Sequence, residues 1–247
     1  MKLDAFALTI TGRRNNNEDA VCVRHDLGLY IVADGMGGYE GGEVASAIAV
    51  ESISELVRRT AGDADVTWPY AIDAARSPSE NELLVATRLA NDRIAARRTG
   101  ELREMGSTVV ALRITDDRAI IAHVGDSRLY RLRAGELAQL TIDHSLAAQL
   151  AASGMKVEAD FQWRHVVTRA LGTHLGEPDV QSVPIRAGDT FLLCSDGLSE
   201  VLAPTTIAAL LADAATCSAE LACRALVDAA YSAGSRDNIS AIVVRAG

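Results

Sequence analysis

The chain has 247 residues, of which 49% are hydrophobic and only 4% aromatic, and its formal net charge is −9. This length fits one domain with a substantial core, so we expect residues 1–247 to form a single domain. The negative charge argues against a general nucleic-acid-binding protein, because such proteins usually present a basic surface to the phosphates.

The first half of the chain predicts three strands followed by two helices. Apolar and β-favouring residues cluster between turn signals at residues 3–10, 20–24 and 29–33. After Gly41 and Gly42, apolar residues recur at helical spacing, which predicts a helix that ends at about residues 60–62. A surface connection over residues 63–79 then precedes a second predicted helix at residues 80–98.

The second half predicts strands at residues 108–114, 119–124 and 129–132, joined by short turns such as Asp116-Asp117 that favour antiparallel pairing. A helix at residues 145–152 leads into an irregular stretch up to residue 183, with a strand or turn at Val166 and Val167. The remaining predicted elements are a strand at 190–194, helices at 205–213 and 219–233, and a strand at 239–244. Strands in runs and helices in pairs predict an α+β fold with antiparallel sheets and external helices.

Cysteine usage and the amino terminus bear on where the protein works. The cysteines form no C-x-x-C pair and have no nearby histidine at zinc-ligand spacing; they are Cys22, Cys194, Cys217 and Cys223. A reduced, intracellular protein is the simpler interpretation. Asp4 and Thr9 make the amino terminus a poor signal peptide, and no apolar run approaches the ~18 residues of a membrane span. We therefore expect a cytoplasmic protein.

Acidic residues lie in turns at the ends of the predicted strands, beside glycine or small residues. These turns carry Glu18 and Asp19, Asp34, Asp126, Asp196 and Asp237. Oxygen donors without nearby histidine or cysteine favour Mg²⁺ or Mn²⁺ over Zn²⁺ or copper. An isolated Asp-Gly pair is usually turn chemistry alone. If all the turns meet, however, their mutual repulsion requires divalent ions to offset it.

Six motifs follow one another over nearly the whole chain. They are residues 14–20 (RNNNEDA), 32–38 (VADGMGG), 106–108 (GST), 123–128 (HVGDSR), 194–197 (CSDG) and 236–238 (RDN). In this order they resemble the metal-dependent protein serine/threonine phosphatase family of type 2C, in its compact bacterial form. The resemblance implies two packed antiparallel β-sheets flanked by helices, an α-β-β-α sandwich with metals in a cleft at one end. It also implies hydrolysis of phosphoserine and phosphothreonine by metal-activated water at a dinuclear Mn²⁺ or Mg²⁺ centre.

The resemblance assigns the metal ligands residue by residue. Asp34 would bridge two metals, and Asp196 and Asp237 would complete the coordination of one of them. The carbonyl of Gly35 would serve the other metal.

The remaining matches concern the second metal, a third metal and the substrate. Glu18 and Asp19 match acids that bind the second metal directly or hold its waters. Asp126 matches an acid that, with Asp196, can hold a weaker third metal in bacterial relatives. Arg14 matches the arginine that grips the substrate phosphate, because a planar guanidinium can bind two phosphate oxygens.

One departure from the family concerns proton transfer. Many eukaryotic relatives have a histidine two residues after the bridging aspartate, proposed to protonate the leaving oxygen, whereas this chain has Met36. That role must therefore pass to a metal-bound water or another acid, or be dispensed with. His123 and His144 are the nearest histidines in sequence, but a histidine beside an apolar strand is more often a packed core residue, so neither is assigned a catalytic role. Cys194 lacks the phosphate loop of cysteine phosphatases after it and is expected to pack at a strand end.

Residues 141–145 (TIDHS) and the irregular stretch after them resemble the mobile flap beside the cleft, and residues 168–172 (TRALG) resemble its exit. We predict a flap subdomain at about residues 145–183, which is expected to carry substrate preference. The expected partners are Ser/Thr-phosphorylated proteins, including a cognate bacterial Ser/Thr kinase, with no nucleic acid and no membrane. A monomer is expected.

Two other functions remain open at this point. A binding module could have kept the fold and lost catalysis, although all the matching metal acids are present. A phosphohydrolase of small molecules could use the same centre. Some family members of this size belong to type VI secretion clusters, and the family resemblance alone supports that link.

Overall fold

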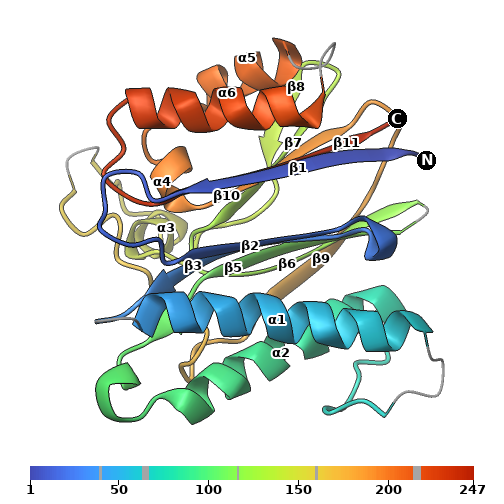
Figure 1. The fold of residues 1–247 in the computed structure, drawn as a ribbon, viewed down its shortest axis with the longest axis vertical. Coiled ribbons are helices and arrows are strands. Elements are labelled where there is room, and N and C mark those ends of the chain that lie inside the picture. Colours follow the sequence, from blue (N-terminus) through green and yellow to red (C-terminus); the bar gives the residue numbers. More distant parts are fainter. Residues whose placement is uncertain (39–40, 63–66, 116, 159–160, 214–217) are drawn as a thin grey trace.

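The computed structural model covers residues 1–247 and describes all of them except 39–40, 63–66, 116, 159–160 and 214–217. Asp116 and Cys217 therefore lie outside the described residues. Two antiparallel sheets pack face to face, and helices cover the outer face of each sheet (Figure 1). The predicted α+β sandwich is confirmed.

The first sheet has five strands in the order β1-β11-β10-β7-β8. These strands are β1 Leu3–Ile10, β11 Ile239–Ala246, β10 Thr190–Cys194, β7 Arg128–Arg133 and β8 Glu136–Gln139. The first and last strands of the chain pair over their full length, from Leu3 opposite Ala246 to Ile10 opposite Ile239. This pairing places the loop after β1 beside the residues that precede β11.

The second sheet has the strand order β2-β3-β5-β6-β9, with a short β4 paired to β3. These strands are β2 Asp19–Arg24, β3 Leu29–Met36, β4 Gly106–Ser107, β5 Val109–Ile114, β6 Arg118–Val124 and β9 Asp179–Pro184. The register puts Asp19 directly opposite Asp34. The predicted strands of both sheets are present, with β3 extending three residues beyond its predicted end at residue 33.

Four long helices form the outer layers. Helices α1 Gly41–Gly62 and α2 Pro78–Arg97 cover the second sheet, and α5 Pro204–Asp213 and α6 Ala219–Ser232 cover the first (Figure 1). The start of α2 is fixed by a capping box, because Ser77 accepts a hydrogen bond from the Glu80 backbone while the Glu80 carboxylate accepts one from Ser77. Shorter helices are η1 His25–Leu27, η2 Gly100–Leu102, α3 Leu146–Ala152 and α4 Asp196–Ser199. Within the described ranges, no helix combines the length and apolar character needed to cross a membrane.

Each sheet is buried on both faces, because apolar layers lie between the sheets and also under the helices. The layer between the sheets includes Tyr30, Leu112, Phe191, Leu193 and Ile242. Separate apolar clusters join the second sheet to α1 and α2, and the first sheet to α5 and α6. Central strands such as β10 are consequently near-continuous apolar runs, with every residue of β10 buried.

Replacing Ile242 with valine is expected to lower the free energy of unfolding by about 1 kcal/mol, because it removes one buried methylene between the sheets. Urea unfolding should show a lower midpoint with an unchanged slope. Ile72→Val is the matched control, because Ile72 is 54% exposed. A control that lost as much stability as Ile242→Val would contradict the assigned core.

The sequence prediction missed β8, β9 and α4, as well as the short elements η1, η2 and β4. Strand β9 lies at the edge of the second sheet, where β6 is its one partner among the described strands. Its sequence, DVQSVP, has few apolar residues, because an edge strand with a part-buried face needs few. The last residues of the irregular stretch therefore belong to this sheet. The strand or turn expected at Val166 and Val167 is a single bridge between Val167 and Ser145.

Candidate metal centre

The acidic turns of both sheets converge at one edge of the sandwich, around a cavity of about 460 Å³. Of the residues singled out from the sequence, this cavity is lined by Arg14, Glu18, Asp34, Gly35, Asp126, Asp196 and Asp237. Asp34 lies near the end of β3, and Asp196 begins α4 directly after β10. Asp237 lies two residues before β11, which pairs with β10. Antiparallel pairing thus brings together acids that are distant in sequence.

Two glycines let the backbone pack tightly beside these acids. A Cβ atom on Gly35 would lie 2.0 Å from the carbonyl oxygen of Gly42, and one on Gly197 would lie 2.0 Å from that of Asn238. Neither contact is sterically allowed, so both positions require glycine. The Asp-Gly pairs therefore serve close packing at the centre as well as turn formation.

Asp19 lies behind the cavity wall and is 9% exposed. The hydroxyls of Ser195 and Ser240 donate hydrogen bonds to its Oδ2 at 2.9 and 2.6 Å. Its Oδ1 and the Oδ1 of Asp196 are buried without a hydrogen-bond partner among the described residues. Buried oxygens of this kind are suited to a cation. Sequence reasoning missed the two serines; Ser195 lies inside a recognised motif, but nothing marked Ser240.

Burial and mutual repulsion perturb the acids of this centre. Burial, reinforced first by the charge of Asp19 and then by that of Asp196, raises the pKa of Asp34 well above its usual value. Burial likewise raises the pKa of Asp19 and of Asp126 to about 7 and that of Asp196 to about 6. Divalent cations would offset this repulsion. Because these acids offer carboxylate oxygens and Gly35 offers a backbone carbonyl oxygen, they fit Mn²⁺ or Mg²⁺.

Arg14 lies at the rim of the cavity, where its side chain is 54% exposed. Its Nη2 donates to Asp237 Oδ2 at 2.6 Å, and its Nε donates to the Arg236 carbonyl at 3.2 Å. These contacts hold a partly exposed guanidinium beside the acids. The centre therefore presents a cation from the chain itself, in a position to meet an anion.

Asn238 fixes the loop that carries Arg14 and Glu18. Its Nδ2 donates to the carbonyls of Thr11 and Asn16 at 2.9 and 2.8 Å, and its Oδ1 accepts from the Glu18 backbone at 2.9 Å. The sequence prediction placed Asn238 in a motif but gave it no role. The structure indicates that it positions the loop and its two functional side chains.

Residues 11–233 match the family model of protein phosphatase 2C. The chain belongs to the protein phosphatase 2C family. It is similar to the serine/threonine protein phosphatase PstP of Mycobacterium tuberculosis, with 36% identity over 235 residues that cover 93% of this chain and 42% of PstP. The chain thus spans less than half the length of that relative.

Two solved structures show the likeness in three dimensions. The catalytic domain of PstP in complex with two manganese ions has a TM-score of 0.82 and 33% identity, covering 98% of this chain and 97% of that one. PppA, a key regulatory component of the T6SS in Pseudomonas aeruginosa, has a TM-score of 0.82 and 30% identity, covering 100% of this chain and 99% of that one. The family resemblance stated from the motifs is confirmed.

A second group of potential ligands in this protein phosphatase 2C domain consists of His123, His144 and Asp179. The Gly125 N–H donates to His144 Nδ1 at 3.0 Å, so the ring proton is assigned to Nε2, which donates to Asp179 at 3.1 Å. Arg169 Nη1 lies 2.9 Å from His144 Nε2 and donates to Asp179 Oδ1 at 2.9 Å, so a cationic side chain already contacts this group. Burial, together with His123, lowers the pKa of His144 to about 4. This group is better explained as a packed, hydrogen-bonded cluster than as a metal site.

Cys194 is fully buried at the end of β10. Burial raises the pKa of its thiol to about 12, so the thiolate needed for nucleophilic attack is scarce at neutral pH. This agrees with the packing role expected for Cys194 in a protein phosphatase 2C domain.

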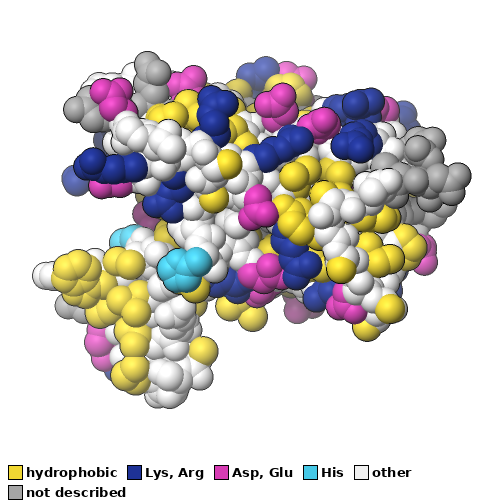
Figure 2. All heavy atoms as spheres, turned by 90° about the horizontal axis from the view of Figure 1, so that it is seen from below, with side chains coloured by type: hydrophobic (Ala, Val, Ile, Leu, Met, Phe, Trp, Pro, Cys, Tyr) yellow, Lys and Arg dark blue, Asp and Glu magenta, His cyan; other side chains and the backbone are white. Residues whose placement is uncertain are grey.

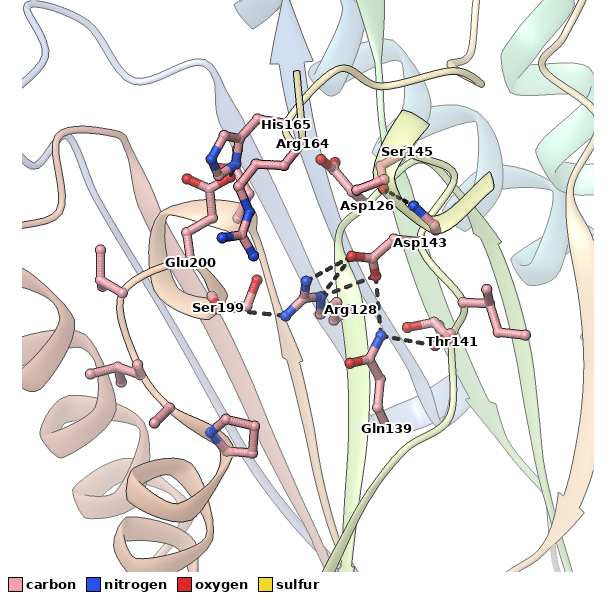
Figure 3. A pocket seen from close by; sticks show the side chains of 18 residues that line it. Asp126, Arg128, Gln139, Thr141, Asp143, Ser145, Arg164, His165, Ser199 and Glu200 are labelled. Carbon is pink, nitrogen blue, oxygen red and sulfur yellow. Dashed lines mark hydrogen bonds and ion pairs between the residues drawn. The ribbon is translucent and has the colours of Figure 1, made fainter. Parts of the chain in front are cut away.

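A larger cavity of about 930 Å³ lies beside the segment predicted to form a flap and shares Asp126, Asp196 and His165 with the candidate metal centre. Figure 3 shows Arg128 in a bidentate pair with Asp143, with distances of 3.0 Å from Nε to Oδ1 and 2.7 Å from Nη2 to Oδ2. This pair ties β7 to the chain entering the flap.

The segment predicted to form a flap projects from the rest of the domain before it reaches β9. Figure 2, seen from the side of α1 and α2, shows it as a projection on the left that carries hydrophobic side chains. Met155 and Trp163 in this segment are 54% and 59% exposed. The flap thus offers apolar surface beside the larger cavity.

Proposed function

We propose that this chain is a metal-dependent phosphoprotein phosphatase, a phosphoric monoester hydrolase that acts on phosphoserine and phosphothreonine. The observation that carries the proposal is that acids from both sheets and Arg14 line the same cavity. A phosphate monoester has about two negative charges near neutral pH, so an acidic protein needs cations to accept it. The protein phosphatase 2C membership and the name of PstP support the same activity.

In this proposal, Asp34 would be a ligand of both main metal ions, and Asp196 and Asp237 would be further ligands of one of them. The Gly35 carbonyl would serve the other ion, with Glu18 and Asp19 as direct ligands or water holders.

Asp126 and Asp196 would hold a weaker third ion. Bound Mn²⁺ or Mg²⁺ supplies Lewis-acid activation of water and of the phosphate oxygens. The two manganese ions of the PstP structure support the number of main ions.

The chain's own groups would bind and orient the substrate. The Arg14 guanidinium would bind two oxygens of the phosphate while Asp237 and the Arg236 carbonyl hold it at the rim. At the end of β3, the Asp34 N–H donates to Thr108 Oγ1 at 3.2 Å, and the Ser107 hydroxyl donates to the Asp34 carbonyl at 3.0 Å. These bonds fix the backbone that carries Asp34, so its carboxylate is preorganised.

The activity is tested with purified protein, Mn²⁺ and several substrates. We expect hydrolysis of phosphoserine and phosphothreonine peptides and of p-nitrophenyl phosphate, abolished by a chelator. Faster hydrolysis of nucleotides or sugar phosphates than of phosphopeptides would point to a small-molecule phosphohydrolase. A folded, metal-loaded protein that turned over no phosphate ester would point to a binding module.

Replacing Arg14 with alanine is expected to lower kcat/KM on a phosphopeptide by about 30-fold, because a charged hydrogen-bonded contact contributes about 2 kcal/mol. Arg13→Ala is the matched control, since the neighbouring Arg13 lies over the Tyr231 ring, 5.6 Å from its centroid. Steady-state kinetics of both variants check the prediction. Equal losses in the two variants would contradict a specific role for Arg14.

We also propose that the protein works as a cytoplasmic monomer on Ser/Thr-phosphorylated proteins, including a Ser/Thr kinase. The similarity to PppA makes secretion-linked phosphoproteins one class to examine. Comparing the phosphoproteomes of cells with and without the gene would identify the substrates. An unchanged pattern of phosphoserine and phosphothreonine would count against this proposal.

A further inference from the structure

The metal centre has Met36 where a histidine proton donor would be expected, so the leaving oxygen needs a proton from elsewhere. Within the described part of the chain, His165 is the one histidine that lines the cavity of the metal centre. The other ionisable groups there are carboxylates, which are assigned to the metals, and Arg14, whose guanidinium does not release its proton. His165 is therefore the candidate for proton transfer.

His165 belongs to the predicted flap, outside the two sheets, and its side chain lines the metal centre. His165 lies in the turn at residues 162–165, just before the bridge from Val167 to Ser145. It lines both the cavity of the metal centre and the larger flap cavity. Its side chain is 53% exposed, so a substrate entering between the two cavities can reach it.

Glu200 orients the imidazole of His165. The His165 Nδ1 is hydrogen-bonded to the Glu200 carboxylate, and Figure 3 shows the two side chains together with Arg164 beside them. Glu200 is the C-cap of α4, the helix that begins with Asp196. The histidine is thus tied to the same short element that carries a proposed metal ligand. A carboxylate at Nδ1 fixes the orientation of the ring and leaves Nε2 free to face the substrate.

We propose that His165 donates its Nε2 proton to the serine or threonine oxygen that leaves phosphorus. This proposal rests on the proposed phosphatase function. Water adds its oxygen to phosphorus, and the ester P–O bond breaks with its electron pair on the side-chain oxygen. That oxygen takes the Nε2 proton and becomes the free alcohol. Solvent accepts the proton lost by the attacking water and returns one to the imidazole, so the net reaction is phosphate monoester plus water giving alcohol plus phosphate.

The test uses two leaving groups in the presence of saturating Mn²⁺. The alkoxide of a serine side chain is a poor leaving group unless it receives a proton, whereas p-nitrophenolate is a good leaving group without one. General acid catalysis typically contributes 10²–10⁴-fold, so His165→Gln should lower kcat on a phosphoserine peptide by about 100-fold. The same variant should change kcat on p-nitrophenyl phosphate little. Added imidazole should restore peptide hydrolysis by His165→Ala.

Two further variants separate proton donation from placement of the flap. Glu200→Gln keeps a hydrogen-bonding side chain but removes the charge, so it should show a smaller loss with the same preference for the activated ester. His25→Ala is the control, because His25 is an exposed histidine on η1 and lines neither of the two cavities. Its activity should match that of the wild type on both substrates.

The outcomes distinguish this inference from the proposed function. Equal losses on both substrates for His165→Gln would overturn proton donation and leave His165 a role in placing the flap. Calorimetric titration with Mn²⁺ should give the same affinity for His165→Gln and wild type; a weakened affinity would also overturn the inference, because the defect would then lie in the centre. Failure of the wild type to hydrolyse any phosphopeptide would instead reject the proposed function.

Discussion

Replacing Asp34 with asparagine is expected to lower phosphatase kcat/KM by about 10³-fold, because metal-ion catalysis contributes several kcal/mol and about 4 kcal/mol corresponds to that factor. Asp34 is the proposed shared ligand, so the change weakens both metal sites at once. Kinetics with Mn²⁺ on a phosphopeptide measure the loss, and calorimetric titration measures the accompanying loss of Mn²⁺ affinity.

The same substitution should stabilise the metal-free protein, because Asp34 is buried among acids whose charges raise its pKa. Asp237→Asn should lower activity in the same direction, since Asp237 lines the same cavity. Asp228→Asn on the exposed face of α6 is the matched control and should leave turnover unchanged. Near wild-type turnover by Asp34→Asn would reject the proposed dinuclear centre.

The metal-free protein is expected to lose stability as the pH rises. Asp126 has a pKa of about 7 in the folded protein, against about 3.9 in an unfolded chain. The folded state therefore holds a proton that the unfolded state has released, so this stability is fully present below pH ~4 and is lost as the pH rises through ~7. The shift corresponds to about 4 kcal/mol at most, and Asp19 and Asp196 act in the same direction.

Urea unfolding with a chelator at several pH values between 5 and 8 measures this loss. His144 acts in the opposite sense, because its pKa is lowered to about 4 in the folded protein. Its contribution to the free energy of unfolding is therefore lost as the pH falls from ~6.5. Comparison with Asp126→Asn isolates Asp126, since His144 is present in both proteins. At pH 8, Mn²⁺ at 100 times its Kd should restore about 2.7 kcal/mol. A metal-free wild type with the same pH profile as Asp126→Asn would contradict the prediction.

The central elements could be predicted from the sequence because their apolar patterns are strong. Strands β1 and β10 were placed at their exact bounds, since each is an apolar run between turn signals. Strands β8 and β9 were missed because an edge strand with one partner needs little apolar character. Four-residue α4 is too short to show a helical period.

The acids of the centre could be predicted from their motifs, but their surroundings could not. Which hydroxyls bind Asp19 depends on how the two sheets stack, so Ser240 has no local signal. The pairing of His165 with Glu200 joins residues 35 positions apart, one of them in an irregular segment. A single sequence contains no periodic pattern that would connect them.

The two hydrogen bonds that Ser195 and Ser240 donate to Asp19 link one sheet of the sandwich to the other. Asp34 also belongs to the second sheet, whereas Asp196 and Asp237 adjoin strands of the first. Ions held by Asp34, Asp196 and Asp237 would therefore cross-link the two sheets at one edge of the sandwich. Loss of metal would then weaken the contact between the two sheets and also abolish the proposed activity. The same ions would contribute to both the catalysis and the stability of the sandwich.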